Sequence, residues 1–324
     1  MNRKRYDREM GKKGLTYMIA VSLIAVVLIG VFFGLDDVER QNRKAIDSKV
    51  NTMNEFVSDL NNDLENAGRI STYRAMIGLE DYIIRNEAFI SDFQSIFREM
   101  MLNGTAEGEA VPIMENSTMR DYIKGVNVIA DEKNLNASID IGAVDLRHSG
   151  PWTLEAEFEA EVLLVEENNI ARWDYTRNYT SQVGIEGLRD PLYSSFTDNR
   201  VASVIQQTPK PFDNSNKTIL ENHTRQGFYV ASEDAPTFLD RFSNDVGNDT
   251  NGIERVMYLQ ELSDQDIEVY PDRPSIAFKY FNNIGGEYYC NFDGYDDTLR
   301  FNFTMDEMER YDLDSLDPSD YDEC

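Results

Sequence analysis

Residues 152–164 read WTLEAEFEAEVLL, and this stretch decides the fold class. Apolar residues occupy every second position, namely Trp152, Leu154, Ala156, Phe158, Ala160, Val162 and Leu164. The residues between them are polar: Thr153, Glu155, Glu157, Glu159 and Glu161. Because successive side chains of a strand point to opposite faces, the pattern predicts a strand with one apolar and one wet face. The glutamates are expected to form a solvated surface rather than a set of catalytic carboxylates.

Further elements lie on both sides of this strand. Asn168-Asn169 predicts a turn into a returning strand, Ala171 to Ile185, and Ile139, Ile141 and Val144 supply an earlier strand. Upstream, apolar residues at helical spacing predict a helix from beyond Gly68 to near Asn103-Gly104 and another from Ser117 to Asp131. We therefore expect an α+β fold in which an antiparallel sheet packs on helices.

A heptad pattern precedes these elements. Its apolar positions step alternately by four and three residues: Ile46, Val50, Met53, Val57, Leu60, Leu64 and Ala67. Since no proline interrupts the chain from Leu15 to Ala67, this seam and the apolar run before it can form one long helix. The apolar stripe needs a cover. Either the chain's own globular body or identical helices of neighbouring subunits could supply it.

The run from Leu15 to Gly34 carries no charge and is long enough to cross a bilayer. Six basic residues precede it, namely Arg3, Lys4, Arg5, Arg8, Lys12 and Lys13, and Asp36-Asp37 follows it. The positive-inside rule then predicts a single transmembrane helix with a cytoplasmic N-terminus and an extracellular body. A removable secretory signal is the rival interpretation, but no small-x-small cleavage site follows the run.

Composition limits the partners and the chemistry. The formal net charge of −28 excludes nucleic acid as a partner, because phosphates would be repelled. Cys290 and Cys324 are the only cysteines, and in an oxidising compartment they predict one disulfide, with a free or intermolecular thiol as the alternative. Eight N-glycosylation sequons begin at Asn103, Asn116, Asn136, Asn178, Asn216, Asn222, Asn248 and Asn302, and all follow the apolar run.

The second half of the chain offers strand candidates Ile267–Tyr270, Ser275–Phe281 and Glu287–Phe292, with Asn282 to Gly286 as a hairpin turn between the last two. A short helix is expected near Pro236 to Phe242. The last residues, from Asp306, predict a solvated acidic tail. Its Asp312, Asp314 and Asp317 lack the spacing of a calcium-binding loop, so a structural calcium stays open but has no motif.

No residue pattern predicts catalysis. His148 and His223 are the only histidines, and neither has a second histidine at ligand spacing or a nucleophile motif nearby. We therefore expect no cofactor and no enzymatic activity, with a carboxylate-dependent hydrolase as a remote alternative. We divide the chain into a basic leader (1–14), a transmembrane helix (15–34), a helical stalk (35–68), the first half of an α+β head (69–193), a β-rich second half (194–305) and an acidic tail (306–324).

The N-terminus resembles the class III signal of archaeal type IV pilin-like proteins. Lys12-Lys13-Gly14 followed by Leu15-Thr16-Tyr17 and an apolar helix carries the resemblance, which implies cleavage between Gly14 and Leu15 by a prepilin-type peptidase. Ile19 stands where many bacterial pilins have a glutamate. The body resembles uncharacterised archaeal membrane-anchored surface proteins in Pro151-Trp152, the segment Ile185 to Tyr193, Phe238 to Phe242, and Gly252 to Glu254.

These resemblances imply a non-enzymatic surface protein of the pilin-like sort, either a filament subunit or a pseudopilin. Its partners would be the lipid bilayer, identical subunits through the N-terminal helix, and the processing peptidase. The alternative is a permanently anchored extracellular adhesin or ligand-binding receptor module, which would stay monomeric.

Overall fold

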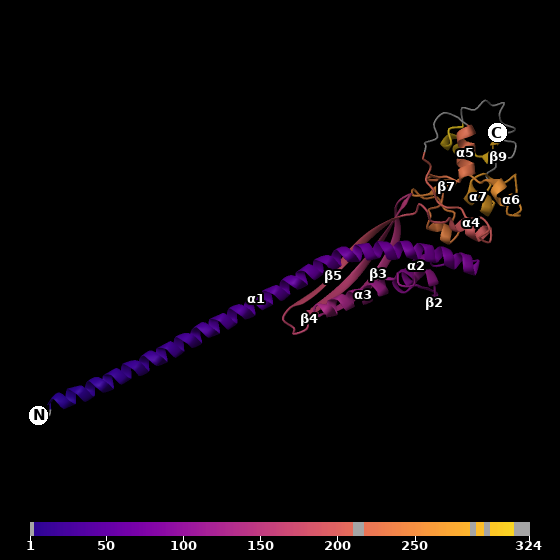
Figure 1. Ribbon diagram of the computed structural model, residues 1–324. Coiled ribbons are helices and arrows are strands. Elements are labelled where there is room, and N and C mark those ends of the chain that lie inside the picture. Colours follow the sequence, from indigo (N-terminus) through magenta and orange to yellow (C-terminus); the bar gives the residue numbers. More distant parts are fainter. Residues whose placement is uncertain (1–2, 210–216, 286–289, 295–298, 314–324) are drawn as a thin grey trace.

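The structure is a computed structural model that describes residues 3–209, 217–285, 290–294 and 299–313. Within the first helix, the side chains of residues 3–21, 29–39 and 41–42 are outside the description. Figure 1 shows a long helix that carries the N-terminus far from an elongated body, with a smaller unit of short elements at the opposite end.

Helix α1 (Arg3–Asn86) is 84 residues long and forms both the projecting rod and one side of the body. It ends where Glu87 adopts a left-handed backbone with φ of 52°. Helix α2 (Phe93–Asn103) then begins at Asp92, whose side chain caps it by accepting from Ser95 N. The predicted boundary at Gly68 is wrong, because the helix continues through this glycine. A Cβ at Gly68 would lie 2.4 Å from Phe158 Cε1, so this glycine permits close helix–sheet packing.

The central sheet has the predicted form. Strands β3 (Leu135–Gly150), β4 (Thr153–Glu166) and β5 (Arg172–Gly184) are antiparallel and lie in the order β3-β4-β5. Asn169, with φ of 57°, forms the predicted turn between the last two strands. Helix α3 (Met119–Glu132) precedes the sheet and begins with a capping box at Thr118. An α+β fold with an antiparallel sheet packed on helices is confirmed.

The heptad seam of α1 packs mostly on this sheet. Met53, Leu60 and Leu64 are at most 3% exposed and share one core with Phe158 of β4. Ile46, at the N-terminal end of the seam, is 43% exposed, because it lies before the point where α1 meets the sheet. The body of the same chain therefore covers most of the stripe, which was one of the two alternatives.

Helix α2 closes the outer edge of the sheet. The side-chain amide of Gln94 donates to Leu146 O at 2.6 Å and accepts from Leu146 N at 3.2 Å, as a neighbouring strand would. Further along the same strand, Arg98 Nη2 donates to Gly142 O at 3.0 Å. Gly142 lies at a register irregularity between Ile141 and Val144, where the β3–β4 pairing shifts. This edge of the sheet is thus occupied by side chains.

The remaining elements are short. Between α2 and α3 lie β1 (Thr105–Ala106), β2 (Glu109–Ala110) and the 3₁₀ turn η1 (Pro112–Met114). The second half contains α4 (Pro191–Phe196), α5 (Lys217–Gln226), β6 (Tyr229–Ala231), η2 (Asp240–Phe242), β7 (Ile253–Arg255), α6 (Leu259–Ser263), α7 (Ala277–Asn282), β8 (Cys290–Asp293), β9 (Arg300–Phe303) and α8 (Met305–Arg310). β6 pairs with β7 and β8 pairs with β9, both antiparallel.

Several predictions for the second half are wrong. Most of the segment Ser275–Phe281 lies in helix α7 rather than in a strand. Ile276, Ala277, Phe278 and Tyr280 are all buried, which a one-sided strand does not allow. Asn283, with φ of 51°, ends this helix instead of opening a hairpin. Residues 267–270 form no strand. β8 pairs with β9, which the sequence did not suggest.

The prediction that a solvated tail begins at Asp306 is wrong. Residues 305–310 form α8, and Met308, Tyr311 and Leu313 are at most 2% exposed in the core of the second half. Its first turn has a capping box, in which Thr304 Oγ1 accepts from Glu307 N and Glu307 accepts from Thr304 N. Asp314 and Asp317 lie outside the described residues.

The structure contradicts the predicted transmembrane helix. Residues 15–34 lie inside α1. Across the described part of the chain, no helix is both long enough and apolar enough for a membrane span. The single-pass transmembrane element of the predicted fold is therefore wrong.

Candidate functional site

The projecting part of α1 exposes large apolar side chains. Leu23, Ile24, Val26, Val27 and Leu28 are between 52% and 66% exposed. Because each helical residue turns by about 100°, these five side chains spread over about 200° of the helix circumference, which is wider than one stripe. The exposed Ser22 and Ala25 lie on the remaining side. Contiguous exposed apolar surface of this kind is typical of an interaction site. We call residues 22–28 the apolar segment.

A buried carboxylate fixes the point where α1 meets the tip of the sheet. Glu166, at the end of β4, forms an ion pair with Lys49 Nζ and also accepts from Asn168 N at 2.8 Å. The hydrogen bond from Lys49 is the largest cause that lowers the pKa of Glu166 to about 2. Farther along α1, Asn61 Oδ1 accepts hydrogen bonds from the hydroxyl groups of Tyr175 and Tyr179 on β5. The rod is thus held to the sheet by polar contacts as well as by its seam.

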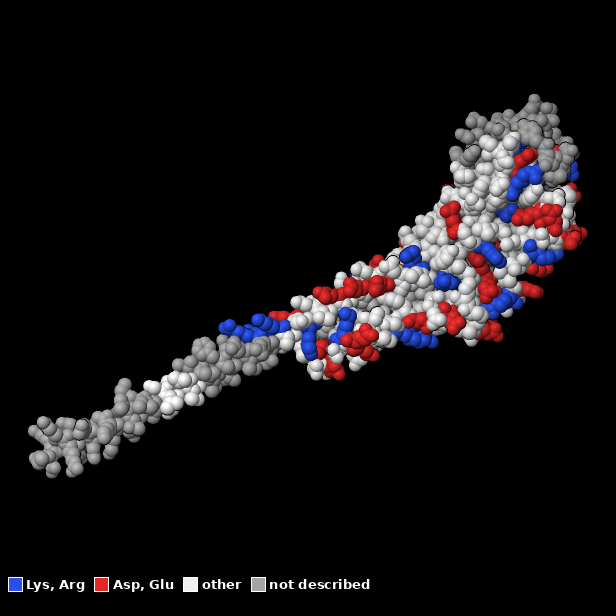
Figure 2. Space-filling model, in the orientation of Figure 1, with Lys and Arg blue, Asp and Glu red and all other residues white. Residues whose placement is uncertain are grey.

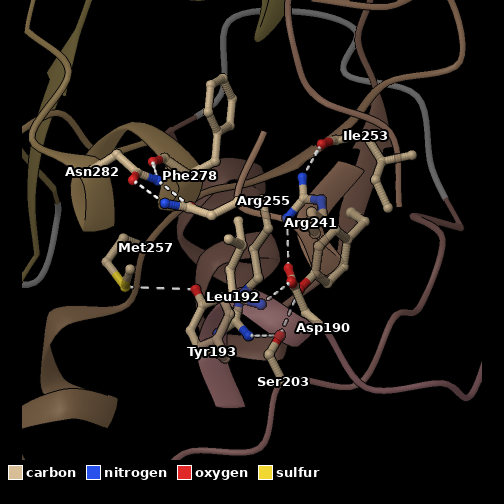
Figure 3. Close-up of polar contacts among 12 residues, drawn as sticks. Asp190, Leu192, Tyr193, Ser203, Arg241, Ile253, Arg255, Met257, Phe278 and Asn282 are labelled. Atoms are coloured by element: carbon tan, nitrogen blue, oxygen red, sulfur yellow. Dashed lines mark hydrogen bonds and ion pairs between the residues drawn. The ribbon is translucent and has the colours of Figure 1, made fainter. Parts of the chain in front are cut away.

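A buried ionic network joins three segments of the second half (Figure 3). Asp190, the N-cap of α4, accepts from Leu192 N at 2.9 Å and from Arg241 Nη1 at 2.6 Å, and both charged side chains are 0% exposed. Arg241 also donates to Ile253 O, and Tyr229 donates to Asp190 Oδ2 at 2.8 Å. The segments around Asp190, Arg241 and Ile253 were singled out from the sequence, and the fold brings them together.

A second arginine extends this network. Arg255, 4% exposed, forms an ion pair with Glu261 at 2.5 Å and donates to Ser203 Oγ, which in turn lies 2.7 Å from the Tyr229 hydroxyl. Its guanidinium also stacks over Tyr193 at 4.7 Å. Each arginine has one carboxylate partner, so the cluster is neutral in sum. Such a cluster is typical of a structural core in which every charge is paired.

A polar cleft of about 500 Å³ lies between α2, the end of β3 and the loops around η2. His148 lines it and donates from Nδ1 to Gly150 O at 3.1 Å, while its Nε2 accepts from Leu239 N at 3.4 Å. Burial is the largest cause that lowers the pKa of His148. Its Nε2 accepts a hydrogen bond and therefore carries no proton in this arrangement. Asp240 accepts from both Thr237 N and Thr237 Oγ1. These side chains are engaged in holding loops.

The remaining predicted site residues are spread over the molecule. Six sequon asparagines are exposed: Asn103, Asn116, Asn136, Asn178, Asn222 and Asn248. Asn302 is 8% exposed, and its amide nitrogen donates to Pro271 O at 2.7 Å and to Arg273 O at 2.8 Å, so that nitrogen is inaccessible to a transferase. Asn216 lies outside the described residues.

The predicted disulfide and processing site fall partly outside the description. Cys290 is disulfide-bonded, whereas Cys324 lies outside the described residues, so their pairing stays a prediction. Gly14 and Leu15 lie within α1 where no side chain is described. His223 is buried, with Nε2 3.0 Å from Thr208 Oγ1. In the described ranges, no group of three or more His, Cys, Asp or Glu residues could hold a metal ion.

Comparisons with models of protein families, with curated proteins and with solved structures gave no match. We therefore infer the function from the geometry of this chain. The apolar segment has large exposed side chains that the fold of one chain leaves uncovered, whereas Arg241 and Arg255 of the buried network each form an ion pair with a carboxylate of the same chain.

Proposed function

We propose that this chain is an exported subunit of a self-assembled filament and that its apolar segment packs against the same segment of other copies. The observation that carries the proposal is the exposure of five large apolar side chains over more than half of the circumference of a projecting helix. A bundle of parallel helices covers every side of each member. Burial of a large apolar side chain contributes roughly 1.5 to 3 kcal/mol, so several such contacts per subunit stabilise an assembly.

Most of the heptad seam of α1 is buried within the subunit, which leaves the apolar segment as the part available to other copies. In the C-terminal half of α1, Met53, Leu60 and Leu64 pack on the sheet. The polar body can then stay in solvent while the rods associate. The expected cleavage between Gly14 and Leu15 belongs to this proposal, because it would remove the basic leader that precedes the apolar run.

Two further observations favour an exported location. Cys290 is disulfide-bonded, and disulfides persist in oxidising environments. Six exposed sequon asparagines lie on the body, where a glycan would be accommodated.

The test compares two matched substitutions in the full chain. Val27 in the apolar segment and Val128 on α3 are both 59% exposed, so Val27→Glu and Val128→Glu introduce the same charge at equal exposure. Each protein is purified in detergent, which keeps the exposed apolar segment dispersed, and the detergent is then removed by dialysis. Electron microscopy and sedimentation measure the fibres that form. We expect wild type and Val128→Glu to form fibres and Val27→Glu to stay dispersed.

A thermal unfolding curve for each protein serves as the folding control, because neither substitution touches the core. Wild-type protein that stays monomeric at all concentrations, or Val27→Glu protein that forms fibres as readily as wild type, would contradict the proposed function.

A further inference from the structure

The polar cleft of about 500 Å³ lies between the two halves of the chain. Residues 91–94 before and within the first turn of α2, together with the end of β3, line one side, and residues between 237 and 251 line the other. A hydrogen bond joins the two sides, since Leu239 N donates to His148 Nε2 at 3.4 Å. A ligand in this cleft therefore contacts both halves at their junction.

Three carboxylates line the cleft: Asp92, Asp240 and Asp249. One oxygen of each accepts a hydrogen bond from a nearby backbone N–H, at 2.7 to 3.1 Å. Among the described residues, no hydrogen bond or ion pair reaches the second oxygen of any of the three. Figure 2 shows basic side chains beside many of the acidic ones on the visible face of the body, whereas these three carboxylates have no described cation as a partner. Their second oxygens are acceptors for a ligand.

The arrangement of these acceptors indicates the class of ligand. A metal ion is not indicated, because the part of the chain that the structure describes has no group of three or more His, Cys, Asp or Glu residues that could hold one. An anion is repelled by the carboxylates, and Arg147 at the rim is already paired with Glu155 at 2.6 Å. Separate acceptors across a wide cleft suit a ligand with several hydroxyl groups, each of which donates one hydrogen bond. A neutral saccharide is such a ligand.

A glycosylation sequon lies at the rim of the cleft, which favours a saccharide over a cationic ligand. It comprises Asn248, Asp249 and Thr250. Asp249 lines the cleft, and Asn248 and Thr250 on either side of it are exposed. The backbone of this segment is held in place, because Asp249 N donates to Ala235 O at 3.2 Å and Gly252 N donates to Asp249 O at 2.9 Å. A glycan on Asn248 would therefore begin next to the cleft.

We propose that the cleft binds the first sugars of an N-linked glycan carried by Asn248. Their hydroxyl groups donate to the second oxygens of Asp92 on one side and of Asp240 and Asp249 on the other. A tethered saccharide needs little intrinsic affinity, because its attachment gives it a high effective concentration at the site. The glycan then bridges the two halves and stabilises their junction. This inference rests on the exported location in the proposed function and assigns a role to one of the exposed sequons.

The test uses the full chain from a glycosylating host, kept dispersed in detergent. Peptide mass spectrometry measures the glycan on Asn248, and hydrogen exchange measures the protection of residues 91–94 and 237–243. We expect these amides to exchange about tenfold faster in Asn248→Gln, because the junction opens more often without the glycan. The matched control Asn178→Gln removes an exposed sequon on β5 and should leave exchange at the cleft unchanged.

A second variant separates binding of the glycan from the fold of the loop. Asp249→Asn keeps the sequon and the Oδ1 acceptor for Asn251 N but removes the negative charge. Wild type and Asp249→Asn are each compared before and after enzymatic deglycosylation. We expect deglycosylation to speed exchange about tenfold in wild type and about threefold or less in Asp249→Asn, a difference between differences that a purely structural effect of the substitution does not produce.

Equal exchange at the cleft with and without the glycan would overturn the inference. So would added spermidine that restores the protection lost with the glycan, since the ligand would then be a cation. A wild-type chain that carries glycans at other sequons but none on Asn248 overturns only this inference, whereas a chain without any glycan also removes one of the observations that favour export. Fibre formation is measured separately, by comparing Val27→Glu with Val128→Glu.

Discussion

Glu80 offers the sharpest quantitative test of the structure. It lies on α1, is 6% exposed, and accepts a hydrogen bond from Arg189 N at 3.0 Å next to the buried Asp190. Burial is the largest cause that raises the pKa of Glu80 from 4.5 to about 8. We therefore consider the substitution Glu80→Gln, which keeps an acceptor for Arg189 N but carries no charge.

The sign follows from the raised pKa. Between pH 4.5 and 8 the folded chain keeps a proton that the unfolded chain loses, so wild-type stability falls as pH rises through this window. At about 1.4 kcal/mol per pH unit, titration of Glu80 lowers the free energy of unfolding by about 3 kcal/mol at pH 7 and by about 5 kcal/mol above pH 8. A glutamine side chain at this position does not titrate and has no such loss. The unfolding free energy of Glu80→Gln should therefore equal that of wild type near pH 4 and exceed it by these amounts at higher pH.

Urea unfolding at a series of pH values, followed by circular dichroism, measures the difference in unfolding free energy. Other groups titrate in both proteins, so the difference isolates Glu80. The neighbouring Asp81→Asn serves as the control, because the Asp81 side chain is 41% exposed and pairs only with Arg85 at the surface. A difference between wild type and Glu80→Gln that stays constant from pH 4 to 9 would refute the reasoning.

Three further outcomes are expected. Gly68→Val should lower the unfolding free energy by about 1 to 3 kcal/mol or more in urea titration, because a Cβ there would lie 2.4 Å from a Phe158 carbon; equal stability would contradict the close packing. Arg241→Met should cost about 3 to 5 kcal/mol, since it leaves the carboxylate of Asp190 buried without its cation, and Arg241→Met combined with Asp190→Asn should recover part of the loss. In a glycosylating host, Asn302→Gln should leave the glycan mass unchanged by mass spectrometry but lower the melting temperature, because the Asn302 amide is buried and hydrogen-bonded; a lost glycan would show that this site is accessible.

The central part of the fold was accessible to sequence reasoning because its patterns are local and one-sided. The alternation in 152–164 and the seam from Met53 to Leu64 each report one buried face, and both faces meet in one core. The turn at Asn169 was predictable because asparagine tolerates the left-handed backbone that it adopts. Gly68 led to a wrong helix boundary. A glycine that allows a sheet to pack closely against a helix cannot be told from one that ends a helix by sequence alone.

The second half was predicted less well, because its elements are short and buried on more than one side. In 275–281 the alternating apolar residues suggested a strand, yet burial of Ala277 as well as Phe278 reflects a helix enclosed by its surroundings. The pairing of β8 with β9 spans a connection without a periodic pattern. The residues of the ionic network stood out in sequence, but only the fold shows that Asp190 and Arg241 are partners.

The apolar segment lies in a run that stands out in the sequence. The apolar run was noticed, although its interpretation as a transmembrane helix is wrong.

The Gln94 side chain protects the β3 edge of the sheet where many copies of the chain lie close together. In the filament that we propose, many sheets would lie close together, and unpaired strand edges that lie close together can pair with one another and aggregate. Gln94 occupies both backbone groups of Leu146 on β3, and Arg98 occupies Gly142 O farther along. Neighbouring bodies would therefore meet a β3 edge whose backbone groups at Leu146 and Gly142 are already hydrogen-bonded. Contacts between subunits would then be made by the helices rather than by strand pairing.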